Sequence, residues 1–150
     1  MAAGERLKLV GLDSEDLQII SAHVQDAVFR VGDLDYLPRH EQFILVGNRF
    51  VWEKAAGRRQ KSFERRRSVL HFDRVKAARA FGIDRSRPDD VLDLLSIRYA
   101  ASATPPAGEV ELVFANDVSI VLDVECIEVQ LADQGGAWET RYRPRHPLSD

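Results

Sequence analysis

The sequence predicts an α+β protein in which a curved antiparallel sheet, or partial barrel, of about six to seven strands carries an N-terminal helix and a C-terminal capping helix. Two observations lead to this fold class. Apolar residues recur at helical spacing only near the two ends of the chain, whereas apolar and polar residues alternate through most of the middle. Turn-forming segments such as Ala115-Asn116-Asp117 separate the alternating runs, as is typical of antiparallel hairpins.

The first predicted element is a helix that begins at Asp13 or Ser14. Either side chain can accept a free N–H group of the first turn, and the acidic residues that follow, Glu15 and Asp16, favour the positive end of the helix dipole. An apolar stripe with helical spacing follows: Leu17, Ile20, Val24 and Val28.

The middle of the chain predicts the strands. A hairpin is expected from the alternating run 29–36 and the apolar run 42–53, with Pro38 between them and Gly47 as a candidate bulge. Further strands are expected at 68–72, 93–99, 110–114 and 118–122. Residues 73–82 fit either a short helix that ends at Gly82 or an edge strand that carries bases outward, and we favour the strand.

The last predicted element is a helix over 124–134. Val124, Ile127 and Leu131 have helical spacing, and Gly135-Gly136 is a natural stop. A curved sheet closed by such a helix is pleckstrin-homology-like by analogy, and this analogy carries no function. A basic loop is expected at 54–67 and a flexible tail at 141–150.

Length and composition fit one globular domain over 1–150, with 45% hydrophobic and 30% charged residues. No stretch approaches the roughly 18 apolar residues of a membrane span, and the first residues lack the apolar core of a signal peptide. We therefore expect a cytoplasmic protein with no membrane contact. Cys126 is the only cysteine, which excludes an internal disulfide and disfavours a cysteine-based zinc site. Nothing in the composition demands a cofactor, so none is expected.

The charge distribution is bipolar. Residues 54–87 hold twelve Lys and Arg against three acids, a net charge of +9, while the rest of the chain has nine bases and 21 acids, a net charge of −12. The formal total is only −3. A local basic block can form a binding surface although the chain as a whole is acidic.

Three interpretations of this basic segment stay open. In the first, it is a solvated loop and an edge strand that its bases keep soluble. In the second, it is a docking surface for an acidic protein or for a second copy of the chain. In the third, it is a site for nucleic acid or another anion. In the third case Phe63, His71 and Phe72 are available to stack on bases. The candidate binding residues are Arg58, Arg59, Lys61, Arg65, Arg66 and Arg67.

No catalytic, metal-binding or nucleotide-binding motif stands out. The carboxylates Asp33 and Asp35 are expected on a solvated strand face, and a second group is expected at the start of the closing helix: Asp123, Glu125 and Glu128. The four histidines have no metal-ligand spacing, and Cys126 has acidic neighbours that disfavour a thiolate. A cryptic enzyme that pairs His71 or His23 with Asp33 or Asp123 is an alternative.

Four stretches resemble a known family: LQIISAHVQDA at 17–27, NRFVWE at 48–53, RRSVLHF at 66–72 and LDVECIE at 122–128. Together they resemble a family of small, uncharacterised alphaproteobacterial proteins, the domain of unknown function 2948. The resemblance covers nearly the whole chain and implies a bacterial, cytosolic, single-domain protein. It implies no catalytic or binding residues.

The sequence thus favours a binding or assembly module without catalytic activity, with an unknown protein partner or a homo-oligomer as its assembly. Nucleic-acid or anionic-ligand binding through the 54–87 segment is the first alternative, and the cryptic His/Asp enzyme is the second.

Overall fold

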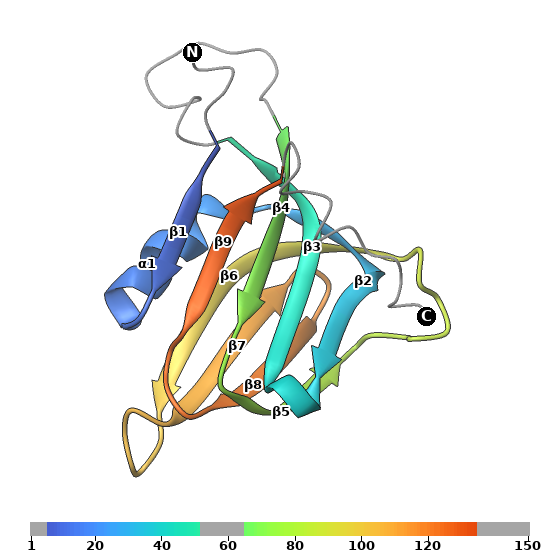
Figure 1. Cartoon of the computed structure of the whole chain (residues 1–150). Coiled ribbons are helices and arrows are strands. Elements are labelled where there is room, and N and C mark those ends of the chain that lie inside the picture. The colour runs from blue at the N-terminus through green and yellow to red at the C-terminus, as the bar shows by residue number, and fades with distance from the viewer. Residues whose placement is uncertain (1–5, 52–64, 135–150) are drawn as a thin grey trace.

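The computed structural model describes residues 6–51 and 65–134, which form nine strands and one α-helix (Figure 1). The helix is α1 (Ser14–His23), and a short 3₁₀ turn, η2 (Pro38–His40), joins β2 to β3. The strands are β1 (Lys8–Gly11), β2 (Val28–Leu37), β3 (Gln42–Phe50), β4 (Arg65–Phe72), β5 (Val75–Phe81), β6 (Val91–Ala101), β7 (Gly108–Phe114), β8 (Val118–Val124) and β9 (Val129–Asp133).

All nine strands belong to one sheet in the order β1-β9-β4-β3-β2-β6-β7-β8-β5, and all of its ladders are antiparallel. The predicted antiparallel sheet is confirmed. The α+β class with six to seven strands is wrong, because the described part of the chain is nearly all β. The sheet does not close on itself, since β1 and β5 stand at its two ends.

The predicted C-terminal helix is also wrong. Val124 ends β8, residues 125–128 form a turn, and β9 then pairs with β4 on one side and β1 on the other. The backbone of β9 is therefore satisfied between two strands, and its Val129 and Leu131 are buried. The apolar residues with helical spacing thus lie in three different places: Val124 at the end of β8, Ile127 in the connection and Leu131 in β9. Without a helix over 124–134 the pleckstrin-homology-like analogy has no support.

The predicted N-terminal helix is confirmed. Asp13 caps it by accepting the Asp16 N–H at 2.8 Å, and Leu17 and Ile20 are buried. The helix ends sooner than the apolar stripe suggested, because Asp26 takes a left-handed conformation (φ 65°) and Val28 already begins β2. Strand β1 precedes the helix, has only four residues and was not predicted from the sequence.

The preference for a strand over residues 73–82 is confirmed by β5. The hairpin between β7 and β8 is confirmed too, and its turn residues Asn116 and Asp117 both have positive φ angles, 68° and 62°, as a tight hairpin turn requires. The register shift expected at Gly47 lies instead on the opposite strand, β2, between Phe29 and Leu34. Gly47 serves close packing, because a Cβ there would lie 2.5 Å from the Phe29 ring.

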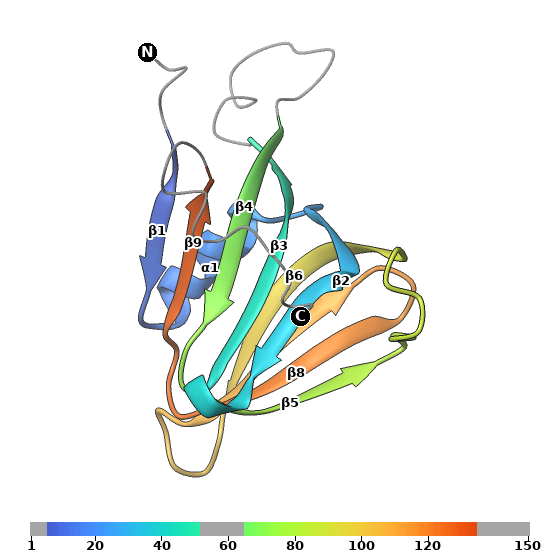
Figure 2. The same ribbon diagram turned by 45° about the vertical axis from the view of Figure 1, so that its right-hand side comes forward.

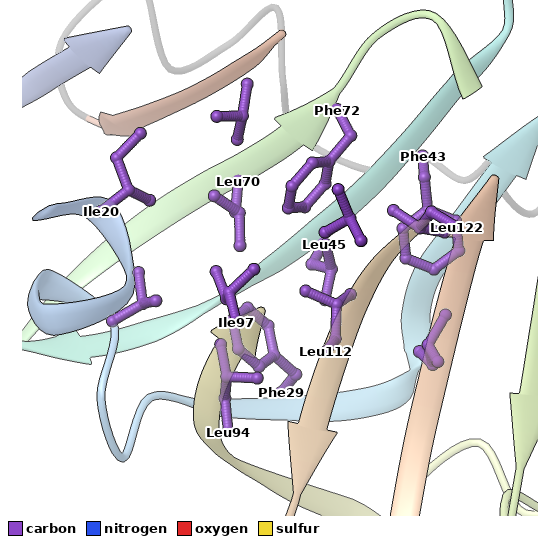
Figure 3. Close-up of a cluster of buried hydrophobic side chains, with 14 of the residues drawn as sticks. Ile20, Phe29, Phe43, Leu45, Leu70, Phe72, Leu94, Ile97, Leu112 and Leu122 are labelled. Atoms are coloured by element: carbon purple, nitrogen blue, oxygen red, sulfur yellow. The ribbon is translucent and has the colours of Figure 1, made fainter. Parts of the chain in front are cut away.

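The core lies between the two halves of the curved sheet. Figure 3 shows Leu45, Leu70 and Phe72 of β3 and β4 near Leu112 of β7, with Ile20 of α1 at one side. Phe72 and Leu112 are at most 1% exposed. The helix packs against β1 and β6, and thus between the two halves of the sheet. No helix in the described part of the chain is long and apolar enough to cross a membrane.

The expected basic loop over 54–67 falls mostly outside the described residues, which resume at Arg65, and the expected tail over 141–150 lies wholly outside them.

Candidate functional site

A cleft of about 430 Å³ lies between β2 and β5. Figure 2 shows these two strands on the same side of the molecule, with β8 behind them. The floor is formed by Phe43 of β3 and Ile120 of β8. The walls and rim are Val31, Gly32, Leu34, Asp35 and Tyr36 of β2, the neighbouring Pro38, Ala78, Arg79 and Ala80 of β5, and Ile83 and Arg85 of the loop that follows β5.

The cleft exists because two strand edges face each other without pairing. The β2–β6 ladder covers only Val28–Arg30, and the rest of the described β2 ladder, 34–37, pairs with β3 alone. On the other side of the cleft, β8 is the only strand in the described part of the chain that pairs with β5. The continuous sheet therefore stops at β5, short of β2.

Hydrogen bonds tie the two ends of the cleft. At one end Val75 N–H donates to Glu41 O at 2.8 Å, and the Tyr36 hydroxyl donates to Val75 O at 3.3 Å. At the other end β2 donates two hydrogen bonds to the 82–90 loop. The Val31 N–H donates to Asp90 O at 2.9 Å, and the Gly32 N–H donates to Pro88 O at 2.8 Å. These bonds therefore join the start of β5 to Glu41 and β2 at one end, and β2 to the loop that follows β5 at the other.

Small residues keep the cleft empty of side chains. Ala78 and Ala80 present only methyl groups from β5, and a Cβ at Gly32 would lie 3.0 Å from Pro88 Cβ. The alanine content that made this segment look helical in the sequence thus has a spatial role in a strand.

Two charges of opposite sign, Asp35 and Arg85, line the cleft. Burial raises the pKa of the Asp35 carboxyl by more than the Arg85 guanidinium and the hydrogen bond from the Tyr36 N–H lower it. Arg79, in contrast, is held over the neighbouring strands by Glu109 at 2.9 Å and Asp123 at 3.0 Å. The cleft is therefore close to neutral, with one carboxylate and one guanidinium that a ligand can reach.

Only three of the six predicted binding residues are described. Arg58, Arg59 and Lys61 lie outside the described residues, so their role stays a prediction. At the start of β4, Arg65 lies over the Phe50 ring, with Cζ 4.7 Å from the centroid. Arg66 is half-buried, and Arg67 forms an ion pair with Asp33 at 3.8 Å. None of these three residues lines the cleft.

The bases on and beside β5 bind acids of the same chain. Arg74 lies 3.3 Å from Glu128, and Lys76 lies 2.9 Å from Glu41 and 3.1 Å from Glu125. Together with the Arg79 pairs, these contacts join the basic segment to the acidic group Asp123, Glu125 and Glu128. Much of the bipolar charge pattern is therefore an internal pairing. The expectation that this acidic group caps a helix is wrong, since a turn occupies that position.

The carboxylates and histidines do not form the predicted catalytic pairs. His71 lies 3.5 Å from Asp73, and His23 Nδ1 lies 2.9 Å from the Ile19 carbonyl oxygen of its own helix. Asp33 is bound by Arg67 and Asp123 by Arg79, so within the described ranges none of the His/Asp pairs is hydrogen-bonded. No group of three or more His, Cys, Asp or Glu side chains in those ranges is arranged to hold a metal ion.

Two further carboxylates have perturbed environments away from the cleft. Burial and the neighbouring Asp26 carboxylate raise the pKa of Asp93, whose Oδ1 is buried and has no hydrogen-bond partner among the described residues. Asp133 is fully buried and accepts hydrogen bonds from Arg49 Nε at 2.8 Å, Arg49 Nη2 at 2.9 Å, Ser68 Oγ at 2.7 Å and the Leu7 N–H at 2.9 Å. Burial alone would raise the pKa of Asp133, but these donors hold it below its usual range.

The sequence pointed to Asp35 by name and to Arg79 and Arg85 only as members of the basic segment 54–87, and it did not bring the three together. Their juxtaposition depends on where the β2–β6 ladder stops, which is a long-range property. The one local sequence signal for the cleft is the pair of small residues Ala78 and Ala80 in β5. The neighbouring bases Lys76 and Arg79 bind acidic side chains of the same chain.

Fold and site define a nearly all-β protein whose open antiparallel sheet carries a cleft between two strand edges. The chain belongs to the family described as "Protein of unknown function (DUF2948)", which matches residues 7–146. This confirms the family resemblance seen in the sequence. No curated protein and no solved structure matches the chain.

Proposed function

We propose that the protein is a binding module whose ligand occupies the cleft between β2 and β5. The observation that supports this most strongly is the cleft itself. Its volume of about 430 Å³ falls within the roughly 300–1,000 Å³ typical of ligand sites. Its apolar floor, Phe43 and Ile120, lies beside a small number of polar groups, Asp35, Tyr36 and Arg85, which is the usual composition of such sites.

The lining favours binding over catalysis. Neither histidine nor cysteine is among the described residues that line the cleft, and the arginines cannot release a proton at ordinary pH. Proton transfer and nucleophilic attack each need an activated group with a suitable neighbour. Asp35 faces a guanidinium, and the Tyr36 hydroxyl already donates to a backbone carbonyl.

The charge of the cleft favours a neutral or zwitterionic ligand over a polyanion. Arg79 is bound by two carboxylates, and Arg85 is balanced by Asp35. A phosphate backbone gains affinity from several bases that release counterions together. One guanidinium balanced by a carboxylate supplies little of that gain.

A screen of small-molecule fragments by ¹H–¹⁵N correlation spectra tests the proposal. We expect several fragments to shift amide signals of 31–36, 78–80 and 83–85, and Ala78→Trp to abolish these shifts by filling the cleft. Ala100→Trp is the matched control, because Ala100 is exposed on β6 and does not line the cleft. If no fragment perturbs these signals, or if Ala78→Trp leaves the shifts unchanged, the proposal is wrong.

A further inference from the structure

We infer that the ligand of the cleft is an extended polypeptide segment of a partner protein, which pairs with the edge of β5 that faces the cleft and directs alternate side chains into the cleft. The inference rests on the proposed function, since the segment occupies the same cleft. It goes further by naming the chemical class of the ligand and the backbone that recognises it.

The backbone of β5 offers an edge to such a segment. This strand has seven residues, and its only ladder among the described residues is with β8. At its other edge the Val75 N–H and C=O already bind Glu41 and Tyr36, so the available groups follow Val75. In an antiparallel strand, alternate residues direct their N–H and C=O groups to the same edge, so β5 presents a row of donors and acceptors toward the cleft. Addition of a strand to such an edge is a recurrent mode of peptide recognition.

β5 also lacks some of the features that commonly protect an edge strand. Proteins commonly block such edges with proline, with very short strands or with lysine side chains that project outward. β5 contains no proline, and its two cations are bound by acids: Arg79 by Glu109 and Asp123, Lys76 by Glu41 and Glu125. Beside the cleft, β5 also presents Ala78 and Ala80, whose methyl groups leave room for another chain.

The shape of the cleft also fits such a segment. From Val31 to Tyr36, β2 covers five residue steps, roughly 17 Å at about 3.3 Å per step. A segment of about five residues therefore fills the cleft. Because residues of a strand point alternately to opposite faces, two or three of its side chains reach Phe43 and Ile120 on the floor while the others face solvent.

Charge complementarity narrows the sequence of the segment. A strand placed against β5 covers Asp35 on the β2 wall and lies beside Arg85 at the rim of the cleft. Burying either charge without an opposite charge is costly. The segment therefore carries a Lys or Arg that faces Asp35, and an Asp or Glu near Arg85, around small apolar residues.

Selection from a random decapeptide display library tests this inference. The full chain is the immobilised bait, and the Ala78→Trp variant, whose cleft is filled, is added in solution to remove peptides that bind elsewhere on the protein. We expect enriched peptides with alternating apolar residues and a base, and affinity for Ala78→Trp lower by about tenfold or more. N-methylation of every second amide of a selected peptide keeps its side chains and removes alternate donors, so it is expected to lower affinity by about tenfold or more. Hydrogen exchange of β5 amides should slow on peptide binding.

A second variant keeps the test independent of the folding of Ala78→Trp. Asp35→Lys reverses the charge of the β2 wall and is expected to select peptides with an acid in place of the base. If the library yields no peptide that prefers the wild type, while fragments still shift the cleft signals, the peptide inference fails and the proposed function stands. Strand pairing is overturned if peptides bind the cleft without slowing hydrogen exchange of the β5 amides and if N-methylation leaves their affinity unchanged. A doubled mass by light scattering, lost in Ala78→Trp, makes a second copy the occupant and also overturns the inference.

Discussion

The two sides of the sheet place charge in opposite ways. On the β1-β9-β4-β3 side, the side chains of Arg49 and Asp133 are each 1% exposed and joined by two hydrogen bonds of 2.8 and 2.9 Å. On the β2–β5 side, Asp35 is half-buried and Arg85 is exposed. The first pair sits among strands that pair on both edges, and the second sits at a cleft where pairing stops.

The difference teaches that burial decides what a charge can do in this protein. Where a charge is buried within the paired strands, as in the Arg49–Asp133 pair, it is tolerated only with its full set of partners. Where the ladder stops, charges keep part of their hydration and remain available to a ligand. The β1-β9-β4-β3 side, the closed side, thus stabilises the fold, and the β2–β5 side, the open side, offers the proposed binding site.

The largest expected effect comes from breaking the buried pair on the closed side. Arg49→Met leaves the Asp133 carboxylate buried with only Ser68 and the Leu7 N–H as donors, and we expect a loss of about 3–5 kcal/mol in the free energy of unfolding. Urea unfolding measures it. The double variant Arg49→Met/Asp133→Leu removes both charges and is expected to recover most of the loss. A loss below about 1 kcal/mol in the single variant would show that the pair is not buried as described.

The pH dependence of stability contrasts the two carboxylates. The pKa of Asp133 lies below its usual 3.8 in the folded state, so its contribution is present above that value and is lost as the pH falls through the lower folded pKa. The pKa of Asp35 is raised, so the folded state holds its proton more tightly, and the free energy of unfolding falls as the pH rises from 3.8 through the folded pKa.

Asparagine variants separate these contributions in urea titrations between about pH 2 and pH 7. Asp133→Asn is expected to lower stability at neutral pH and to flatten the acid limb of the profile. Asp35→Asn is expected to raise stability slightly at neutral pH, because it removes the cost of ionising a half-buried carboxyl. A loss of stability in Asp35→Asn would mean that the attraction to Arg85 outweighs burial.

The smallest effect is expected at the rim of the open side. Arg79→Ala removes contacts to Glu109 and Asp123, but all three side chains are about half-exposed. Exposed ion pairs are worth about 0–1 kcal/mol, so unfolding in urea should change by no more than that. A loss comparable to that of Arg49→Met would contradict the contrast between the two sides.

The local parts of the fold were predictable from the sequence, and the long-range parts were not. The Asp13 cap fixes the start of α1, and the Asn116-Asp117 turn fixes the β7–β8 hairpin, because both act over a few residues. β9 was mistaken for a helix because its partners, β1 and β4, lie far from it in sequence. For the same reason neither the Arg49–Asp133 pair, 84 residues apart, nor the cleft could be derived from spacing.

Hydrogen exchange of the free protein tests the central claim, that the sheet is open between β2 and β5, most directly. The account predicts fast exchange for the cleft-facing amides of 33–37 and for those of β5 after Val75, whose own N–H is bound to Glu41. It predicts slow exchange for the amides of β4 and β9, which lie in ladders on both sides. Equal protection at the cleft and in β9 would contradict it, because the two edges would then already be paired in the free protein.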